Sequence, residues 1–135
     1  GMVLPASGCA FLSIKDDDKT QEMIEAAQIL TGLGFTLVAT RGTQSWLAEQ
    51  GVDCGVVKKV YEGRPDITDL MKNGGVQLVM NSTEDARAVE DSKSLRSVAL
   101  YDKIPYFTTA AGSHAAALAI QAQADGDVGV KSLQG

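Results

Sequence analysis

The feature that most constrains the fold of this chain is an alternation of short apolar runs with segments of helical periodicity. Apolar runs predict five strands, at residues 9–14, 35–39, 54–60, 76–80 and 103–107. Helical patterns predict five helices, at residues 20–33, 44–50, 66–72, 84–101 and 113–124. Consecutive parallel strands need such crossover helices. The alternation therefore predicts an α/β fold with a mostly parallel, doubly wound sheet and helices on both faces.

The length of 135 residues fits one domain. No internal repeat or low-complexity linker divides the chain, so we expect a single domain over residues 1–135. The tail from about residue 126 lacks clear periodicity, and we expect it to fray.

Charge and cysteine usage limit the possible partners. The formal net charge is −5, which argues against nucleic acid. No apolar run reaches the ~18 residues of a membrane span, and no secretion signal pattern is present. Cys9 and Cys54 lie in apolar runs without a CxxC or Cys/His neighbourhood, which disfavours zinc and favours reduced thiols in a cytoplasmic protein.

A hydroxyl-rich turn, Thr40-Arg41-Gly42-Thr43, follows the second predicted strand and opens a helix. Glycine permits close approach of the backbone, and helix amides beside hydroxyls can hold a phosphate. The alternative is that Thr40 or Thr43 only caps the helix.

A second turn of this design, Asn81-Ser82-Thr83, follows the fourth strand, with capping again as the alternative. Loops that follow the strands of a doubly wound sheet share one edge. We therefore expect both turns to face one crevice.

Ser13 ends the first strand, and two cations lie near the same edge, Lys19 after the first strand and Lys59 near the end of the third. Together with the two turns, these residues predict an anion site that suits a phosphate and a polar ring. We expect the segment 62–66 to shape the pocket wall, with Arg64 bracing it.

Catalytic signatures are missing from the sequence. It has no Gly-x-Ser-x-Gly elbow, Walker loop or GxGxxG, and its one histidine, His114, has no evident nucleophile partner. The pattern is typical of a binding module.

Several segments of the sequence resemble those of one family, the C-terminal regulatory domain of the carbamoyl phosphate synthase large subunit. The most specific segment is Lys59-Val60-Tyr61-Glu62-Gly63-Arg64-Pro65. It is followed in order by Lys72-Asn73-Gly74, Asn81-Ser82-Thr83, Arg87 to Ser92 and Arg96, and it is preceded by Gly8, Ser13, Asp18-Lys19 and the turn at 40–43. The resemblance covers residues 4 to about 120.

The resemblance implies a methylglyoxal-synthase-like fold, which is a Rossmann-like three-layer sheet. It implies a non-catalytic domain without a cofactor, which binds UMP or IMP and so regulates carbamoyl phosphate synthesis for pyrimidine and arginine biosynthesis. The implied parent is a glutamine-hydrolysing ligase that uses ATP with Mg or Mn. The implied partners are the rest of the large subunit and the small glutaminase subunit.

The same resemblance implies roles for individual residues. The phosphate would be held by Lys19, Thr40, Gly42 and Thr43, and Arg41 would add an anion contact. Phosphate, ribose or base would be contacted by Lys59, Asn81, Ser82 and Thr83, with Ser13 and Asp91 also lining the site.

Three alternatives share the predicted fold. A methylglyoxal-synthase-type lyase needs a Gly-Gly-Asp segment, which residues 81–85 lack. An IMP cyclohydrolase domain needs a lysine-threonine-histidine segment, which is missing from this sequence. A vestigial interaction domain would bind no nucleotide. Within the family that this sequence resembles, the urea-cycle branch binds N-acetylglutamate and departs from the pattern of residues 59–65. Because the pattern is kept here, the resemblance favours a nucleotide ligand.

Overall fold

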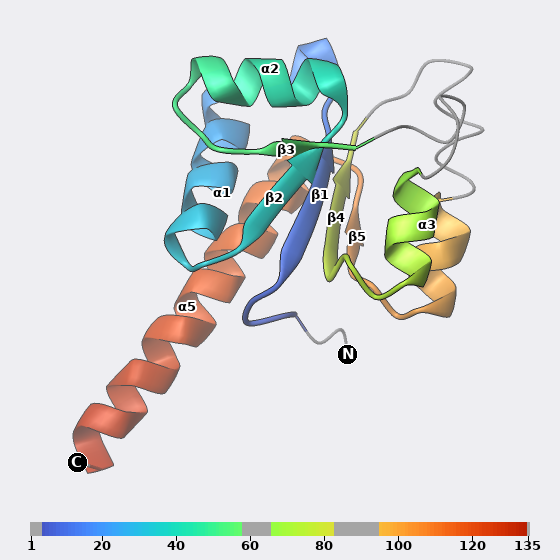
Figure 1. Ribbon diagram of the computed structural model, residues 1–135. Coiled ribbons are helices and arrows are strands. Elements are labelled where there is room, and N and C mark those ends of the chain that lie inside the picture. The colour runs from blue at the N-terminus through green and yellow to red at the C-terminus, as the bar shows by residue number, and fades with distance from the viewer. Residues whose placement is uncertain (1–3, 58–65, 83–94, 135) are drawn as a thin grey trace.

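The computed structural model describes residues 4–57, 66–82 and 95–134, with the backbone alone over 126–134 (Figure 1). Its sheet has five strands: β1 (Cys9–Ser13), β2 (Thr36–Ala39), β3 (Gly55–Val56), β4 (Leu78–Asn81) and β5 (Tyr106–Phe107). Their spatial order is β3-β2-β1-β4-β5, and every neighbouring pair is parallel. The predicted α/β fold with about five parallel strands is confirmed.

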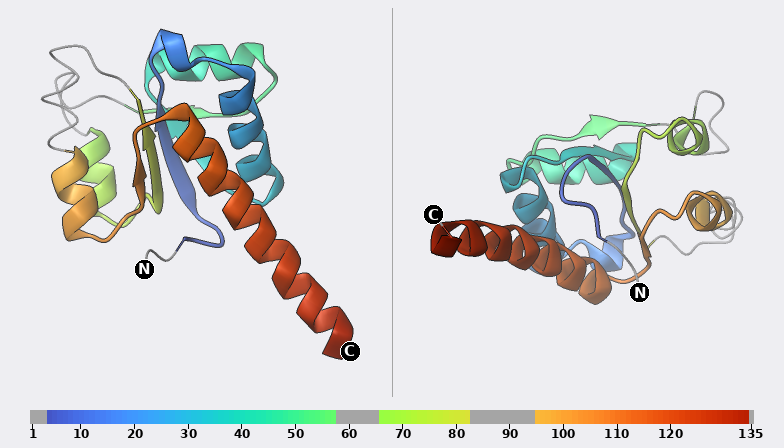
Figure 2. Two further views of the ribbon diagram at one scale, coloured as in Figure 1. Left: turned by 180° about the vertical axis from the view of Figure 1, so that it is seen from behind. Right: turned by 90° about the horizontal axis from the view of Figure 1, so that it is seen from below.

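The named helices are the 3₁₀ turn η1 (Asp16–Asp18), α1 (Gln21–Gly32), α2 (Arg41–Glu49), α3 (Ile67–Lys72) and α5 (Ala110–Gln134). Residues 95–101 are also helical. Helix α5 packs beside α1 and then continues away from the sheet, as the rear view in Figure 2 shows. Among the described helices, none combines the length and the apolar character that crossing a bilayer requires.

The central strands β1 and β4 are buried on both faces, as is usual in parallel sheets, whereas the edge strand β3 is exposed. On β1, Ala10 and Leu12 join the core cluster that contains α1, α2 and α5, whereas Phe11 joins the cluster of α3 and residues 95–101. Strand β4 alternates in the same way, with Val79 facing the second cluster. The period-2 alternation of β1 and β4 thus fills two cores, one on each face of the sheet, and produces three layers.

Strand β1 is the switch point of the sheet. Leu12 pairs with Ala39 of β2 on one side, and Ser13 pairs with Asn81 of β4 on the other. After β1 the chain continues to β2, and after β4 it continues to β5, so the two connections run toward opposite edges of the sheet. In open α/β sheets, ligands bind in the crevice at the carboxyl ends of such strands.

Three predicted helix boundaries were wrong. Helix α2 begins at Arg41, not at residue 44, because Thr40 is already the extended N-cap residue directly after β2. Helix α5 begins at Ala110, not at residue 113, and continues to Gln134, past the predicted end at residue 124. Fraying of the tail stays a prediction. An established helix propagates easily, so the glycines of the tail do not end it.

Other boundaries agree with the sequence. Gly34, predicted to end the first helix, has φ of 96° and terminates α1. Asp66, the residue before α3, forms a capping box with Asp69. Parts of the predicted strand 54–60 and of the predicted helix 84–101 lie outside the described residues.

Candidate functional site

Five polar side chains are buried where β1, β2 and β4 end. They are Ser13, Thr40, Thr43, Asn81 and Ser82. Burying hydroxyls and amides costs free energy unless they are hydrogen-bonded, so such a concentration needs a specific network.

Thr43 connects α2 to the end of β1. Its Oγ1 accepts a hydrogen bond of 3.0 Å from the backbone N–H of Ile14 and one of 3.2 Å from the Thr40 hydroxyl. The Thr40 side chain makes no capping hydrogen bond to α2. The alternative in which Thr40 caps the helix is therefore wrong, because its hydroxyl is directed to Thr43.

A second set of contacts joins β1 to β4. The Ser82 N–H donates to the Ser13 carbonyl at 2.8 Å, and the Lys15 N–H donates to Ser82 Oγ at 3.1 Å. Asn81 Nδ2 donates to the Tyr106 hydroxyl of β5 at 2.7 Å. The first residues after β1 and β4 are thus held together across the switch point.

The start of α2 supplies backbone donors that make no hydrogen bond within the helix. The N–H groups of Arg41, Gly42 and Thr43 precede the first bond within the helix, which Gln44 makes to the Thr40 carbonyl at 2.8 Å. No other described group accepts a hydrogen bond from them. These donors carry the positive end of the helix dipole, which favours an anion.

Lys19 brings a full positive charge to this helix start. Its Nζ lies 4.0 Å from the position that a Cβ on Gly42 would occupy. The same Nζ donates to Asp16 Oδ1 at 2.7 Å. This hydrogen bond, with the attraction between the two charges, holds the pKa of the Asp16 carboxyl below its usual value. An ammonium, backbone amides and hydroxyls therefore converge on one small region.

The structure brings most of the predicted site residues to this edge. Ser13, Lys19, Thr40, Gly42, Thr43, Asn81 and Ser82 lie there as described above, and exposed Arg41 is the first residue of α2. Lys59, Thr83 and Asp91 lie outside the described residues, as does Arg64.

Sequence reasoning missed the pairing of Asp16 with Lys19 and the contact between Asn81 and Tyr106. The spacing of Asp16 and Lys19, three residues apart on a turn, could have indicated the first. The second joins residues 25 positions apart and leaves no local signal.

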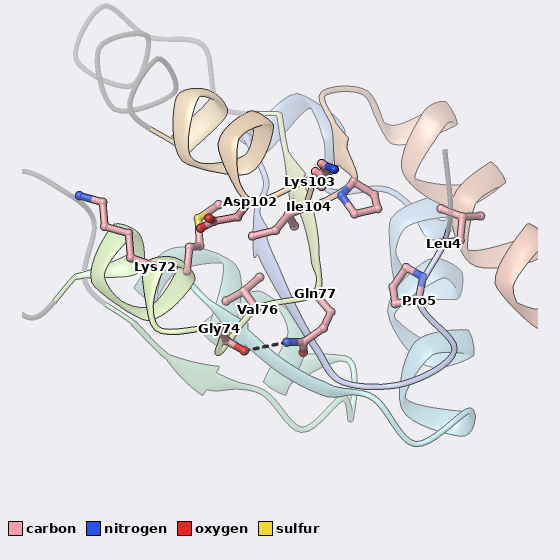
Figure 3. Close-up of a pocket in the computed structure, with 11 residues that line it drawn as sticks. Leu4, Pro5, Lys72, Gly74, Val76, Gln77, Asp102, Lys103 and Ile104 are labelled. Carbon is pink, nitrogen blue, oxygen red and sulfur yellow. Dashed lines mark hydrogen bonds between the residues drawn. The ribbon is translucent and has the colours of Figure 1, made fainter. Parts of the chain in front are cut away.

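A hollow of about 390 Å³ lies at the opposite edge of the sheet (Figure 3). Its walls include Met71, Val76, Ile104 and Pro105. The amide of Gln77, which also lines it, is occupied by hydrogen bonds with the Gly74 carbonyl and the Cys9 N–H. None of the described residues predicted for the site lines this hollow. We place the candidate site at the carboxyl edge, where the described residues concentrate buried hydroxyls, the amides that begin α2 and the charge of Lys19.

Groups suited to bond-breaking chemistry are few in the described residues. No cluster of three or more His, Cys, Asp or Glu among them could hold a metal ion. His114 contacts Glu25 at 3.3 Å and Glu22 at 3.8 Å, and neither partner is an activated nucleophile. Burial, followed by the proximity of Cys9, raises the pKa of Cys54 to about 11, which makes this thiol a poor nucleophile at neutral pH.

Comparison with known proteins identifies relatives. The family model described as MGS-like domain matches residues 22–108. The carbamoyl phosphate synthase large chain of Rhizobium meliloti (strain 1021) is 46% identical over 134 residues, which are 99% of this chain and 11% of the relative. The large chain of Mesorhizobium japonicum is 48% identical over the same shares. That of Halomonas eurihalina is 52% identical over 112 residues, 83% of this chain and 10% of the relative. The chain thus spans about a tenth of the length of these relatives.

Proposed function

This chain belongs to the MGS-like domain family, and we propose that it is the effector-binding regulatory domain of a glutamine-dependent carbamoyl phosphate synthase. One observation carries the proposal: the Lys19 ammonium lies 4.0 Å from the position that a Cβ on Gly42 would occupy, in the first turn of α2. Extended similarity to carbamoyl phosphate synthase large chains supports the choice of parent protein.

We propose that the ligand is a nucleoside monophosphate, UMP or IMP. Its phosphate accepts hydrogen bonds from the amides of Gly42 and Thr43 and pairs with Lys19. The absence of a side chain on Gly42 leaves room for phosphate oxygens to approach the backbone. A dianionic phosphate at a helix start is stabilised by the dipole and by charge-assisted hydrogen bonds.

The polar groups beyond the phosphate suit a ribose and a base. Asn81 and Ser82 end β4 on the other side of β1, so a ligand anchored at α2 extends across the switch point toward them. Lys59, Thr83 and Asp91 complete the proposed set, and Ser13 lines the site from β1.

Regulation requires that binding change how this domain contacts the catalytic body. Within the domain, the ligand contacts the starts of connections that leave β1, β2 and β4, so its binding free energy is available to reposition them. Coupling between an effector and a catalytic site is typically ~1–3 kcal/mol. We propose that the catalytic steps, with ATP and the glutaminase partner, belong to other parts of the parent protein.

Calorimetric titration of this chain with UMP, then IMP, tests the proposal, with N-acetylglutamate as the control ligand. We expect saturable nucleotide binding that the Lys19→Met substitution weakens by roughly 10- to 100-fold, the loss of one charge-assisted bond. Lys72→Met is the matched control, because Lys72 borders the hollow at the opposite edge of the sheet. Equal loss of affinity in both variants, or no nucleotide binding, contradicts the proposal.

A lyase that acts on dihydroxyacetone phosphate is the second candidate, because the family model takes its name from that fold relative. The described end of β4 offers Asn81 and Ser82, which are neither acids nor bases. Turnover of dihydroxyacetone phosphate by the purified chain would favour this candidate.

A further inference from the structure

The positive charge that the proposed phosphate would meet already has a partner. Lys19 Nζ lies 2.7 Å from Asp16 Oδ1, which is within hydrogen-bond distance. The two side chains differ in their surroundings: that of Lys19 is 21% exposed, whereas that of Asp16 is 92% exposed. The ammonium is thus held against the protein, and its counter-ion lies on the solvent side.

We propose that Asp16 is an internal competitor that lowers the affinity of the site for a phosphate. A phosphate at the start of α2 and the Asp16 carboxylate require the same ammonium. Binding must therefore break or share the ion pair, and any carboxylate that stays nearby repels the incoming anion. This inference rests on the proposed function, because it concerns the affinity of the same site.

The opposite role, in which Asp16 positions Lys19 for the ligand, does not fit the high solvent exposure of the Asp16 side chain. A residue that is 92% exposed restricts its partner weakly, since it is itself free to move. The backbone of Lys19 is also fixed independently of the ion pair, because its N–H donates to the Asp16 carbonyl at 3.1 Å. Removing the Asp16 charge should free the ammonium without displacing it.

Isothermal titration of four variants tests this role, with UMP and inorganic phosphate as the two probes. Asp16→Asn removes the competing charge and keeps the shape of the side chain. Asp17→Asn is the matched control, because it removes the same charge from the same exposed turn and Asp17 has no described bond to Lys19. Lys19→Met and the double variant Asp16→Asn/Lys19→Met complete the cycle.

We expect Asp16→Asn to tighten binding of both probes by about two- to fivefold relative to Asp17→Asn, which matches the modest strength of exposed ion pairs. The gain should disappear in the Lys19→Met background. Equal affinities for the two asparagine variants, or weaker binding by Asp16→Asn, overturn the inference and leave the proposed function standing.

The two proposals fail in different ways. Tighter binding of inorganic phosphate by Asp16→Asn, without UMP binding by any variant, supports the competitor role and contradicts the nucleotide function. Absence of binding of both probes to every variant contradicts both.

Discussion

The Lys19 ammonium lies 4.0 Å from the point that a Cβ on Gly42 would occupy, although 22 residues, which include α1 and β2, separate them in the sequence. The contact depends on the parallel pairing of β1 with β2, which brings the residues after both strands to one edge. Gly42 therefore keeps open the space between a cation and the amides of α2. Substitution of Gly42 should therefore have opposite effects on the stability of the fold and on ligand affinity.

Replacement of Gly42 by alanine should stabilise the fold and weaken nucleotide binding. Alanine restricts the unfolded chain and suits a helix, so we expect a gain of about 0.4–1 kcal/mol in the free energy of unfolding. The added methyl group occupies the approach to the amides, and UMP affinity should fall by roughly tenfold. Gly32→Ala is the matched control, because a Cβ at this exposed helical position contacts nothing within 4 Å. Unchanged affinity in Gly42→Ala would contradict this arrangement.

Replacement of Thr43 by valine should destabilise the protein. Valine keeps the shape but removes the oxygen that accepts from Ile14 N–H and the Thr40 hydroxyl, both buried. An unsatisfied buried donor costs about 1–3 kcal/mol. Urea unfolding measures this change, with Thr36→Val, at an exposed position of β2, as the control. Similar unfolding midpoints for the two variants would show that the Thr43 hydroxyl has no structural role.

Helix α3 depends on its N-cap residue. Asp66 Oδ1 accepts hydrogen bonds from the N–H groups of Thr68 and Asp69 at 3.0 and 3.2 Å. We expect Asp66→Ala to lower the free energy of unfolding by about 0.5–2 kcal/mol. Asp53→Ala, which removes a carboxylate from an exposed loop position, is the control in the same denaturation series. An equal effect of both substitutions would assign the loss to charge and not to capping.

Alkaline pH should reveal the environment of Cys54. Its pKa is raised to about 11 in the folded state from 9.0, so the unfolded chain loses this proton first. Stability from this thiol is complete below about pH 9 and declines as the pH rises toward 11. The two-unit difference corresponds to ~2.7 kcal/mol. We expect Cys54 to contribute about 1 kcal/mol or less to the free energy of unfolding, because the thiol is only half-buried and water screens the effect.

The measurement is the free energy of unfolding of the wild type and of Cys54→Ala between pH 8 and pH 11. Only the difference in pH dependence reports on Cys54, since lysines and tyrosines titrate in both proteins. Parallel pH profiles would contradict a raised pKa.

Most of the fold could be predicted from the sequence because its signals are local. Alternating apolar runs identify strands, and Gly34 or Asp66 marks helix ends through backbone conformation and capping. Predictions of helix boundaries were wrong where local sequence signals conflict. The glycines after residue 124 suggest a break, yet α5 continues through them, and the polar turn at 40–43 conceals a helix that begins at Arg41.

The location of the candidate site at one edge of the sheet was predictable from the sequence, whereas its hydrogen-bond network was not. Parallel strands place Thr40, Thr43, Asn81 and Ser82 at one edge, which follows from topology alone. Which hydroxyl bonds to which group depends on register and side-chain direction. The bonds from Ile14 to Thr43 and from Asn81 to Tyr106 join residues far apart in the sequence and are seen only in three dimensions. Their role in binding stays a prediction.

The central position of β1 also has a consequence for biosynthesis. Its neighbours are β2 and β4, and its pairing with β4 joins Ser13 to Asn81, 68 residues later. On the ribosome, the nascent chain can pair β1 with β2 early, but the second edge of β1 stays open until β4 has emerged. Closing that long loop is a late and slow event, as for other non-local pairings. The two turns of the candidate site can therefore lie side by side only after the pairing of β1 with β4 has formed.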